Sequence, residues 1–340
     1  MSAAAAQPPG APPVQRVLAL SGGVGGAKLA LGLSRVLEPT ALDIVVNTGD
    51  DFRHLGLAIS PDIDTLLYTL AGLADPLRGW GRRDETWQFM GALERLGGET
   101  WFALGDADLA LHVQRTHRLG CGETLGEVTA TFARQLGIAA RIAPMSDDPV
   151  RTRVATDEGR LDFQDYFVRR RCAPAVRALA FDGAGGARPS PLLLGLAHEP
   201  APRAVVLCPS NPWLSIDPML ALPGVRAAIA ACTAPVVAVS PLVAGRAVKG
   251  PTAKLMGELG LPVTHASIAS HYAGLIDALI VDAGEPALDA PGAVQVVVAP
   301  TLMESLDDRE RLARTVLEVA DRVLRQRVRD RAAAATEAQQ

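Results

Sequence analysis

Six short, mainly apolar runs constrain the fold of this chain most strongly. Each is four or five residues long, is rich in Val, Ile and Leu, and precedes turn-forming or helical sequence. Such runs are typical of parallel strands that helices cover on both faces. The pattern therefore predicts an α/β fold with a Rossmann-like, mostly parallel sheet and helices on both faces. The runs are VLAL (17–20), DIVV (43–46), AVVL (204–207), PVVAV (235–239), ALIV (278–281) and VQVVV (294–298).

Two further segments interrupt the strand pattern. Between about residues 61 and 140 the apolar residues recur at helical spacing, which predicts a helical cap. Within about 150–182, alternating residues around Glu158-Gly159 predict an inserted β-hairpin before the sheet resumes. The helical patterns in the cap are ETWQFMGALERL (85–96), DADLALHVQRTH (106–117) and ETLGEVTATFARQL (123–136).

The two ends of the chain differ from this central part. Residues 1–15 are rich in Ala and Pro and lack both a basic start and a long apolar stretch, so we expect a disordered leader. Ser305 and Asp308 stand at capping-box spacing and predict the start of a last helix. We expect one domain over residues 16–325 and a loose C-terminal tail over 326–340.

Size, charge and cysteine content narrow the class of protein. A chain of 340 residues, about half of them apolar, can bury a substantial core. Its net charge of −4 gives no general attraction to nucleic acid, so a local site must hold any anionic ligand. The four cysteines are scattered without a CxxC pair, and no segment reads as membrane-spanning. We therefore expect reduced thiols, a cytoplasmic location and neither a nucleic-acid nor a membrane partner.

The first strand ends in the glycine-rich turn SGGVGGAK (21–28), at the edge of the sheet where ligands bind in folds of this type. Exposed backbone N–H groups and the start of the next helix favour phosphate there. The turn matches neither common fingerprint, because a Rossmann turn would have Gly where Lys28 stands and a Walker A motif would continue Gly-Lys-Ser/Thr. A turn needed only for close helix packing is the open alternative.

Carboxylates gather in the next two loops, NTGDD (47–51) and SPDIDT (60–65). Ser60 followed by proline predicts a helix start, which puts Asp62 and Asp64 near the first turn. Acids at that position can serve only the helix dipole. Four carboxylates on adjacent loops also repel one another unless a cation or proton intervenes, and Mg²⁺ bound by one or two of them together with phosphate oxygens would relieve this.

A later turn, CPSNPWLSI (208–216), presents Ser210 and Asn211, whose side chains can hydrogen-bond a nucleotide. The local sequence suits a plain proline-stiffened turn equally well. MSDDP (145–149) is another polar turn after an apolar run, and its acids can equally cap or brace the hairpin.

Together these segments resemble the CofD/FbiA family over roughly residues 16–305. The resemblance rests on SGGVGGAK, NTGDD, SPDIDTLLYTLAG, GWGRRDETW, LGDADLALH, MSDDP, FQDYFV, PSNPWLSI and KGPTAKLM, which occur in the family's order and approximate spacing. It implies a 2-phospho-L-lactate transferase or a close variant, which joins a phosphorylated three-carbon acid to the deazaflavin Fo in coenzyme F-420 biosynthesis. It also implies Mg²⁺ dependence, a Rossmann-like sheet and a homodimer.

The resemblance assigns roles to individual residues. Asp50 and Asp62 match the family's Mg²⁺ carboxylates, and Asp64 matches the carboxylate beside the ribityl chain of Fo. Ala103 stands at a deazaflavin contact where some relatives carry lysine, so only a backbone contact is expected there. The phosphate and nucleotide contacts match Gly22, Gly23, Gly25, Gly26, Lys28, Ser210 and Asn211.

The implied reaction starts from a guanylylated acid whose phosphorus is attacked by the ribityl hydroxyl of Fo, with GMP leaving. Asp64 would orient or deprotonate this hydroxyl, and Trp80 and Trp87 are candidate walls for the flat deazaflavin. The acid stays open among phospholactate, phosphoenolpyruvate and 3-phosphoglycerate derivatives. Two alternatives are a non-catalytic regulator that binds nucleotide sugars and, with its fingerprint broken at Lys28, an NAD(P)-dependent oxidoreductase.

Overall fold

A computed structural model describes residues 16–197, 202–243, 246–247, 250–283 and 294–337. The expected leader at residues 1–15 and the last three residues of the expected tail lie outside this part of the chain. In the part that is described, no helix is long and apolar enough to cross a membrane.

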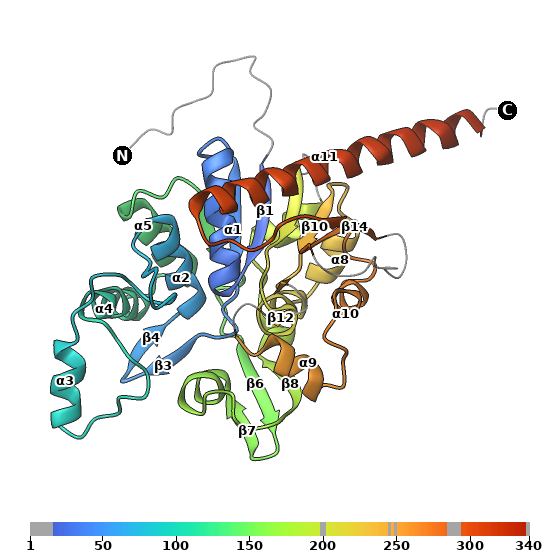
Figure 1. Ribbon diagram of the computed structural model, residues 1–340. Coiled ribbons are helices and arrows are strands. Elements are labelled where there is room, and N and C mark those ends of the chain that lie inside the picture. Colours follow the sequence, from blue (N-terminus) through green and yellow to red (C-terminus); the bar gives the residue numbers. More distant parts are fainter. Residues whose placement is uncertain (1–15, 198–201, 244–245, 248–249, 284–293, 338–340) are drawn as a thin grey trace.

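A seven-stranded parallel sheet forms the centre of the molecule (Figure 1). The strand order is β14-β13-β10-β9-β1-β2-β5, and every neighbouring pair is parallel. All residues of β1, β2, β9, β10 and β13 are buried, which explains why their sequences are mainly apolar runs. The predicted α/β fold is confirmed. The strand bounds are β1 (Val17–Ser21), β2 (Leu42–Val46), β5 (Arg141–Pro144), β9 (Ala204–Leu207), β10 (Val236–Val239), β13 (Ala278–Val281) and β14 (Gln295–Val298).

Two hydrophobic cores lie on opposite faces of this sheet. One core joins alternate strand residues such as Val17 and Ile44 to Leu29, on α1 (Gly23–Val36), and Leu312, on α11 (Leu306–Glu337). The other joins the intervening strand residues to the chain between β9 and β13. That region contains α7 (Asp217–Leu220), α8 (Val225–Ala230), α9 (Thr252–Glu258) and α10 (His265–His271), with a short strand pair β11 (Leu242–Val243) and β12 (Arg246–Ala247).

The last helix is longer than expected. Ser305 and Asp308 form the predicted capping box, because the Asp308 N–H donates to the Ser305 hydroxyl at 3.1 Å and the Ser305 N–H to the Asp308 carboxylate at 2.9 Å. From there α11 continues to Glu337 and extends beyond the body of the protein in Figure 1. The loose tail predicted from residue 326 is therefore helical as far as 337, since that stretch is free of Gly and Pro and rich in strong helix formers.

The cap and the inserted hairpin are both present. The cap contains α2 (Pro61–Leu70), α3 (Gln88–Arg95), α4 (Asp106–Gly120) and α5 (Leu125–Gln135), preceded by a small hairpin of β3 (Phe52–His54) and β4 (Leu57–Ile59). The insertion has one more strand than predicted, because the returning chain pairs with β6 on its other side. Its strands are β6 (Arg151–Thr156), β7 (Gly159–Asp162) and β8 (Val176–Asp182), and α6 (Pro191–Leu194) follows them.

The strand order changes direction between β1 and β9. From β1 the chain proceeds outward through β2 and β5, whereas from β9 it proceeds to the opposite edge through β10, β13 and β14. The loops that follow β1 and β9 therefore diverge, and in open α/β sheets such a point is where ligands bind. The loop after β1 is the glycine-rich turn, and the loop after β9 contains Ser210 and Asn211.

Candidate functional site

Ser210 links the two diverging loops. Its hydroxyl accepts a hydrogen bond from the Gly22 N–H at 3.0 Å and donates one to the Gly22 carbonyl at 2.8 Å. A Cβ on Gly26 would lie 2.6 Å from the hydroxyls of both Ser21 and Ser210, so only glycine fits there without a shift. The structure thus brings Gly22, Gly26 and Ser210 together through contacts within the protein.

Gly25 and Gly23 serve different purposes in the same turn. A Cβ on Gly25 would lie 2.4 Å from the backbone oxygen of Pro209, so this glycine allows the two loops to approach closely. Gly23 faces open space, but its φ of +63° is a conformation that glycine adopts readily. Close packing therefore accounts for Gly25, whereas Gly23 is needed for backbone shape at the start of α1.

The carboxylate of Asp62 lies at the N-terminus of α1. Its Oδ1 accepts the Gly23 N–H at 2.8 Å and its Oδ2 accepts the Asn47 amide at 3.0 Å. Burial raises the pKa of Asp62 to about 6, although these two hydrogen bonds oppose the shift. A phosphate at this helix end would meet the Asp62 carboxylate, so the two anions need a cation between them.

Asp50 is the second buried carboxylate at this edge. Its Oδ1 has no hydrogen-bond partner, and burial together with the neighbouring charge of Asp62 raises its pKa well above the ordinary value. Within the described residues, no three His, Cys, Asp or Glu side chains gather closely enough to form a metal site by themselves. A cation held here would have two protein carboxylates and would need its other ligands from substrate or water, which suits Mg²⁺.

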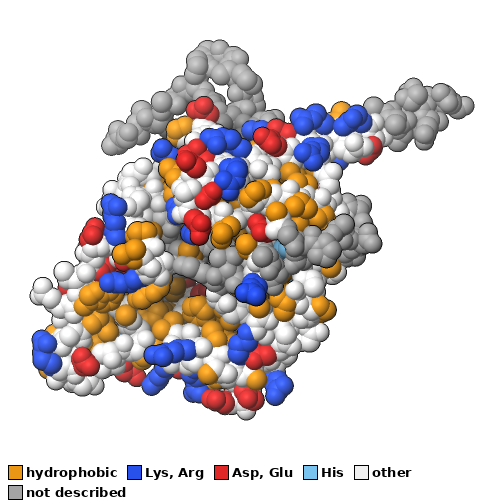
Figure 2. Space-filling view, in the orientation of Figure 1, with side chains coloured by type: hydrophobic (Ala, Val, Ile, Leu, Met, Phe, Trp, Pro, Cys, Tyr) orange, Lys and Arg blue, Asp and Glu red, His pale blue; other side chains and the backbone are white. Residues whose placement is uncertain are grey.

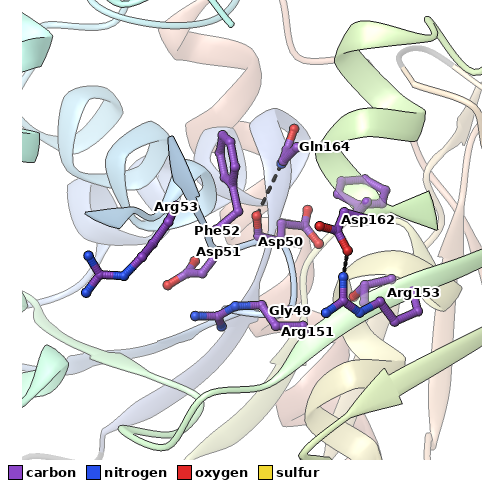
Figure 3. Close-up of a pocket in the computed structure, with 11 residues that line it drawn as sticks. Gly49, Asp50, Asp51, Phe52, Arg53, Arg151, Arg153, Asp162 and Gln164 are labelled. Atoms are coloured by element: carbon purple, nitrogen blue, oxygen red, sulfur yellow. Dashed lines mark hydrogen bonds and ion pairs between the residues drawn. The ribbon is translucent and has the colours of Figure 1, made fainter. Parts of the chain in front are cut away.

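A cavity of about 250 Å³ opens beside Asp50, between the loop at 49–53 and the inserted sheet. Residues 151–153 of β6 and residues 162–164 complete its lining, as Figure 3 shows. Gln164 closes one side by donating its amide to the Asp50 backbone carbonyl at 3.3 Å. In the space-filling view this face of the molecule is hollowed, and apolar side chains border the hollow (Figure 2).

Asp51, the second aspartate of NTGDD, also lines this cavity, although the family resemblance assigns it no individual role. Its Oδ2 accepts the Ser60 hydroxyl at 2.7 Å, so Ser60 occupies the predicted N-cap position but turns its hydroxyl to Asp51 instead of the helix backbone. The other oxygen, Oδ1, has no partner, and burial raises the pKa of Asp51 to about 7. The doubled aspartate of NTGDD was the available signal, but it does not say which carboxylate faces which ligand.

A second cavity of about 250 Å³ adjoins the first, because both are lined by Asp51, Phe52, Arg53 and Arg151. The MSDDP turn at 145–149 forms another part of its wall. The acids of this turn brace the fold: Asp147 accepts the Gly126 N–H of α5 at 2.7 Å, and Asp148 accepts the Arg188 N–H at 2.8 Å.

Asp64 contacts a different set of residues from Asp62, since side chains two positions apart on a helix point about 200° apart around its axis. Both oxygens of the Asp64 carboxylate accept hydrogen bonds from the guanidinium of Arg115 on α4, and one of these measures 3.1 Å. Both side chains are buried, and His112 lies 3.7 Å from the same carboxylate. Asp64 lines neither of the two cavities. No sequence pattern indicates that Arg115 pairs with Asp64, because 51 residues separate the two.

Trp80 and Trp87 also lie outside the two cavities. Trp80 is about half exposed, and the guanidinium of Arg78 lies over the ring of Trp87 at 4.6 Å. Phe52 lines both cavities and belongs to a different group of rings: it packs against Phe102 with ring centres 4.9 Å apart and against Trp101 at 6.0 Å. Trp101 and Phe102 directly precede Ala103 in the sequence, which was the signal available for them.

Lys28 and Asn211 make contacts within the protein. The Lys28 ammonium donates to the backbone carbonyl of Met303 at 2.6 Å, beside the start of α11. The Asn211 side chain accepts the N–H groups of Trp213 and Leu214 at 3.0 and 3.1 Å and donates to the Thr252 hydroxyl at 3.0 Å. Asn211 thus caps its own proline-containing turn and ties it to α9.

Comparison with known proteins identifies similar sequences over nearly the whole chain. Residues 17–318 match a family model described as 2-phospho-L-lactate transferase CofD. A Streptomyces griseus protein named phosphoenolpyruvate transferase is 39% identical over 91% of this chain and 99% of its own length. A Mycobacterium bovis protein of the same name is 37% identical over 80% of this chain and 89% of its own length.

The fold is also similar to that of a solved structure. A Bacillus halodurans protein described as a member of the UPF0052 family superposes with a TM-score of 0.58 at 16% identity, covering 89% of this chain and 99% of its own. At this level of identity the similarity concerns the fold alone.

Proposed function

The chain belongs to the CofD family of transferases, and we propose that it moves a phosphorylated three-carbon acid from a guanosine diphosphate-linked donor to the ribityl hydroxyl of Fo. The product would be coenzyme F-420-0 or a variant of it. Family membership favours this activity over a nucleotide-sugar-binding regulator or an NAD(P)-dependent oxidoreductase. The broken dinucleotide fingerprint at Lys28 also argues against an oxidoreductase.

We propose phosphoenolpyruvate as the acid. Relatives that are 37–39% identical over most of both chains carry the name phosphoenolpyruvate transferase, whereas the family as a whole is described by 2-phospho-L-lactate. The three candidate acids differ by few atoms, so a few pocket side chains can decide between them. The names of these similar relatives are therefore a stronger argument for the acid of the donor than the description of the family as a whole.

One observation carries the proposal: the buried Asp50 and Asp62 carboxylates lie where the glycine turn and the Ser210 loop meet. This arrangement suits a diphosphate, since Asp62 already accepts the Gly23 N–H of α1 and a cation is needed to admit a second anion. Asp50 and Asp62 would hold Mg²⁺, which when bound supplies positive charge to the diphosphate oxygens. The residues of the two loops would position the GMP half against the switch point of the sheet.

The transfer exchanges one phosphorus–oxygen bond for another. The Fo hydroxyl oxygen bonds to the phosphorus that carries the acid, the bond from this phosphorus to the oxygen bridging to GMP breaks, and GMP leaves with that oxygen. The hydroxyl proton passes to a carboxylate or to water. Catalysis of such a transfer rests mainly on positioning and charge neutralisation. Both Asp64 oxygens are engaged by Arg115, so Asp64 is better suited to orienting the hydroxyl than to taking its proton.

We propose Phe52, Trp101 and Phe102 as the wall for the deazaflavin in place of Trp80 and Trp87. Phe52 lines both cavities and packs against Trp101 and Phe102, whereas Trp80 and Trp87 neither line the cavities nor pack against Phe52. Flat aromatic ligands pack well against such ring clusters. A contact from the Ala103 backbone is compatible with this arrangement, because that residue follows Phe102 directly.

The test is product formation from defined donors. Purified protein with Mg²⁺ and Fo would receive guanylylated phosphoenolpyruvate, phospho-L-lactate or 3-phosphoglycerate in separate reactions. We expect mass spectrometry to show Fo bearing the phosphoenolpyruvyl unit, with one GMP released per product. A folded protein that binds GDP and Fo yet forms no product from any donor would refute the transferase activity. Faster product formation from another donor would refute only the choice of acid.

A further inference from the structure

Arg151 and Arg153 lie two positions apart on the same face of β6, next to the loop at 49–53 that contains Asp50. Side chains on a strand alternate between faces, and Thr152 and Val154 are buried on the opposite face. The Thr152 N–H donates to the Gly49 carbonyl at 2.7 Å, which fixes β6 against the loop that contains Asp50. Both arginines therefore line the cavity of about 250 Å³ beside Asp50.

The two guanidinium groups differ in their partners. Arg153 forms ion pairs with Asp162 and with Asp182, the latter at 3.0 Å. The Arg151 guanidinium donates to the Val150 carbonyl at 2.7 Å and has no carboxylate within 4.0 Å among the described residues. Figure 3 shows Arg153 turned toward Asp162, whereas Arg151 points to the opposite side, where Asp51 is drawn. The cavity thus contains a half-buried cation with no carboxylate this close in the described part of the chain, although its charge partly offsets the rise in the pKa of the nearby Asp51.

We propose that Arg151 binds the carboxylate of the three-carbon acid in the donor, an inference that rests on the proposed function. Every candidate acid carries a carboxylate within a few bonds of its phosphate. Asp50, which would lie next to the donor's diphosphate, lines the same cavity as Arg151. A donor held at the glycine turn therefore directs its acid toward β6.

The chemistry of the two groups supports this pairing. A guanidinium presents its N–H donors as a planar fork that matches the two oxygens of a carboxylate, and a partly enclosed site strengthens the contact. Arg53 also lines the cavity without an ion pair, but it is exposed and donates to the Gly56 carbonyl of its own turn at 2.9 Å. Of the two unpaired arginines, Arg151 is the more buried and is fixed through Thr152 to the Asp50 loop.

The test compares two donors in equilibrium binding, so that turnover is not needed. Guanylylated phosphoenolpyruvate carries the carboxylate, whereas the ethyl ester of GDP on its terminal phosphate lacks it. Calorimetry in Mg²⁺ without Fo would give the affinity ratio of the two donors for the wild type, Arg151→Gln and Arg151→Lys. Arg153→Gln is the matched control, because Arg153 lines the same cavity but already has carboxylate partners.

We expect the wild type to prefer the carboxylated donor by roughly thirtyfold or more, the scale of losing one partner of a buried charge pair. Arg151→Gln should abolish this preference while leaving GDP affinity unchanged, and Arg151→Lys should restore part of it. Arg153→Gln should keep the preference. An Arg151→Gln protein that melts as the wild type does and still prefers the carboxylated donor would overturn the assignment, as would loss of the preference in Arg53→Gln alone.

These outcomes are separable from failure of the proposed function. If the wild type binds GDP but binds the two donors with equal affinity, the carboxylate site is refuted whether or not transfer occurs. If the wild type shows the preference and Arg151→Gln loses it, yet Fo receives no acid in the product assay, the site stands and the proposed transfer fails.

Discussion

Arg115 and Asp64 form a bidentate ion pair in which both side chains are buried. The pair joins α4 of the cap to the first turn of α2, next to the acidic loops. Removing one partner of a buried pair leaves the other charge without compensation.

We expect Asp64→Asn and Arg115→Met each to lower the free energy of unfolding by about 3–5 kcal/mol. The double variant, which removes both charges, should lose clearly less than the sum of the single variants. Urea denaturation followed by circular dichroism measures these values. If Asp64→Asn unfolds as the wild type does but loses transfer to Fo, Asp64 acts on the substrate and its structural role is minor.

The metal proposal predicts a specific effect on stability. In the presence of GDP, Mg²⁺ should raise the melting temperature of the wild type, because a ligand that binds only the native state stabilises it. Asp50→Asn and Asp62→Asn should each remove most of this increment, whereas the neighbouring variant Asp51→Asn should keep it. Differential scanning fluorimetry over a Mg²⁺ series gives the comparison. If only Asp51→Asn loses the Mg²⁺-dependent increase in melting temperature, then Asp51 binds the metal and Asp50 and Asp62 do not.

The buried strands and the start of the last helix could be predicted from the sequence, because each has a local sequence pattern. Strands such as β1 and β9 are buried on both faces, so their sequences are mainly apolar, and Ser305 and Asp308 carry a local helix-start pattern. Contacts between distant segments leave no such pattern. Arg115 meets Asp64 across 51 residues, and Arg151 lines the same cavity as Asp50 because the Thr152 N–H donates to the Gly49 carbonyl. The aromatic residues illustrate the same point, because the sequence identifies each tryptophan but does not show which rings or cavities lie near it.

The glycine turn offers a matched pair of substitutions. In Gly25→Ala the new Cβ would lie 2.4 Å from the Pro209 carbonyl oxygen, which backbone movement alone can relieve, and we expect a loss of about 3 kcal/mol. In Gly23→Ala the new Cβ meets no atom within 4 Å, so only the φ of +63° opposes it, at a cost of about 1 kcal/mol. Chemical denaturation ranks the two. Equal losses would mean that the close approach of the Pro209 carbonyl does not determine the cost of a side chain at Gly25.

The ring cluster predicts how Fo binding responds to aromatic substitutions. Phe52→Leu and Trp101→Leu should each weaken Fo binding about fivefold or more, since each removes a flat surface worth roughly 1 kcal/mol or more against an aromatic ligand. Trp80→Leu is the control and should leave binding within twofold of the wild type. Titration of the intrinsic fluorescence of Fo measures all three. A larger loss of Fo affinity in Trp80→Leu than in Phe52→Leu and Trp101→Leu would indicate that the deazaflavin binds beside Trp80 instead.

Asp43 predicts the pH dependence of stability at the other edge of the sheet. It is buried on β2 and accepts hydrogen bonds from Arg16, before β1, and from Arg141 on β5 at 2.8 Å. Although burial opposes the shift, the two guanidinium groups hold the pKa of Asp43 below its ordinary value of 3.8. A carboxyl whose pKa is lower in the folded state stabilises the fold fully above pH 3.8 and loses that contribution as pH falls through its folded pKa.

Asp43→Asn should therefore lower the free energy of unfolding at pH 7 by about 2 kcal/mol, the scale of hydrogen bonds to a charged group. The difference from the wild type should narrow steadily as the pH falls below 3.8. Asp321→Asn is the control: Asp321 pairs with Arg203 at 2.8 Å in a more exposed position, so it should cost less than about 1 kcal/mol. Urea unfolding at pH 7, 5 and 3 tests both variants. A deficit in Asp43→Asn that stays constant down to pH 3 would show that packing, and not the charge held by the two arginines, fixes these three strands together.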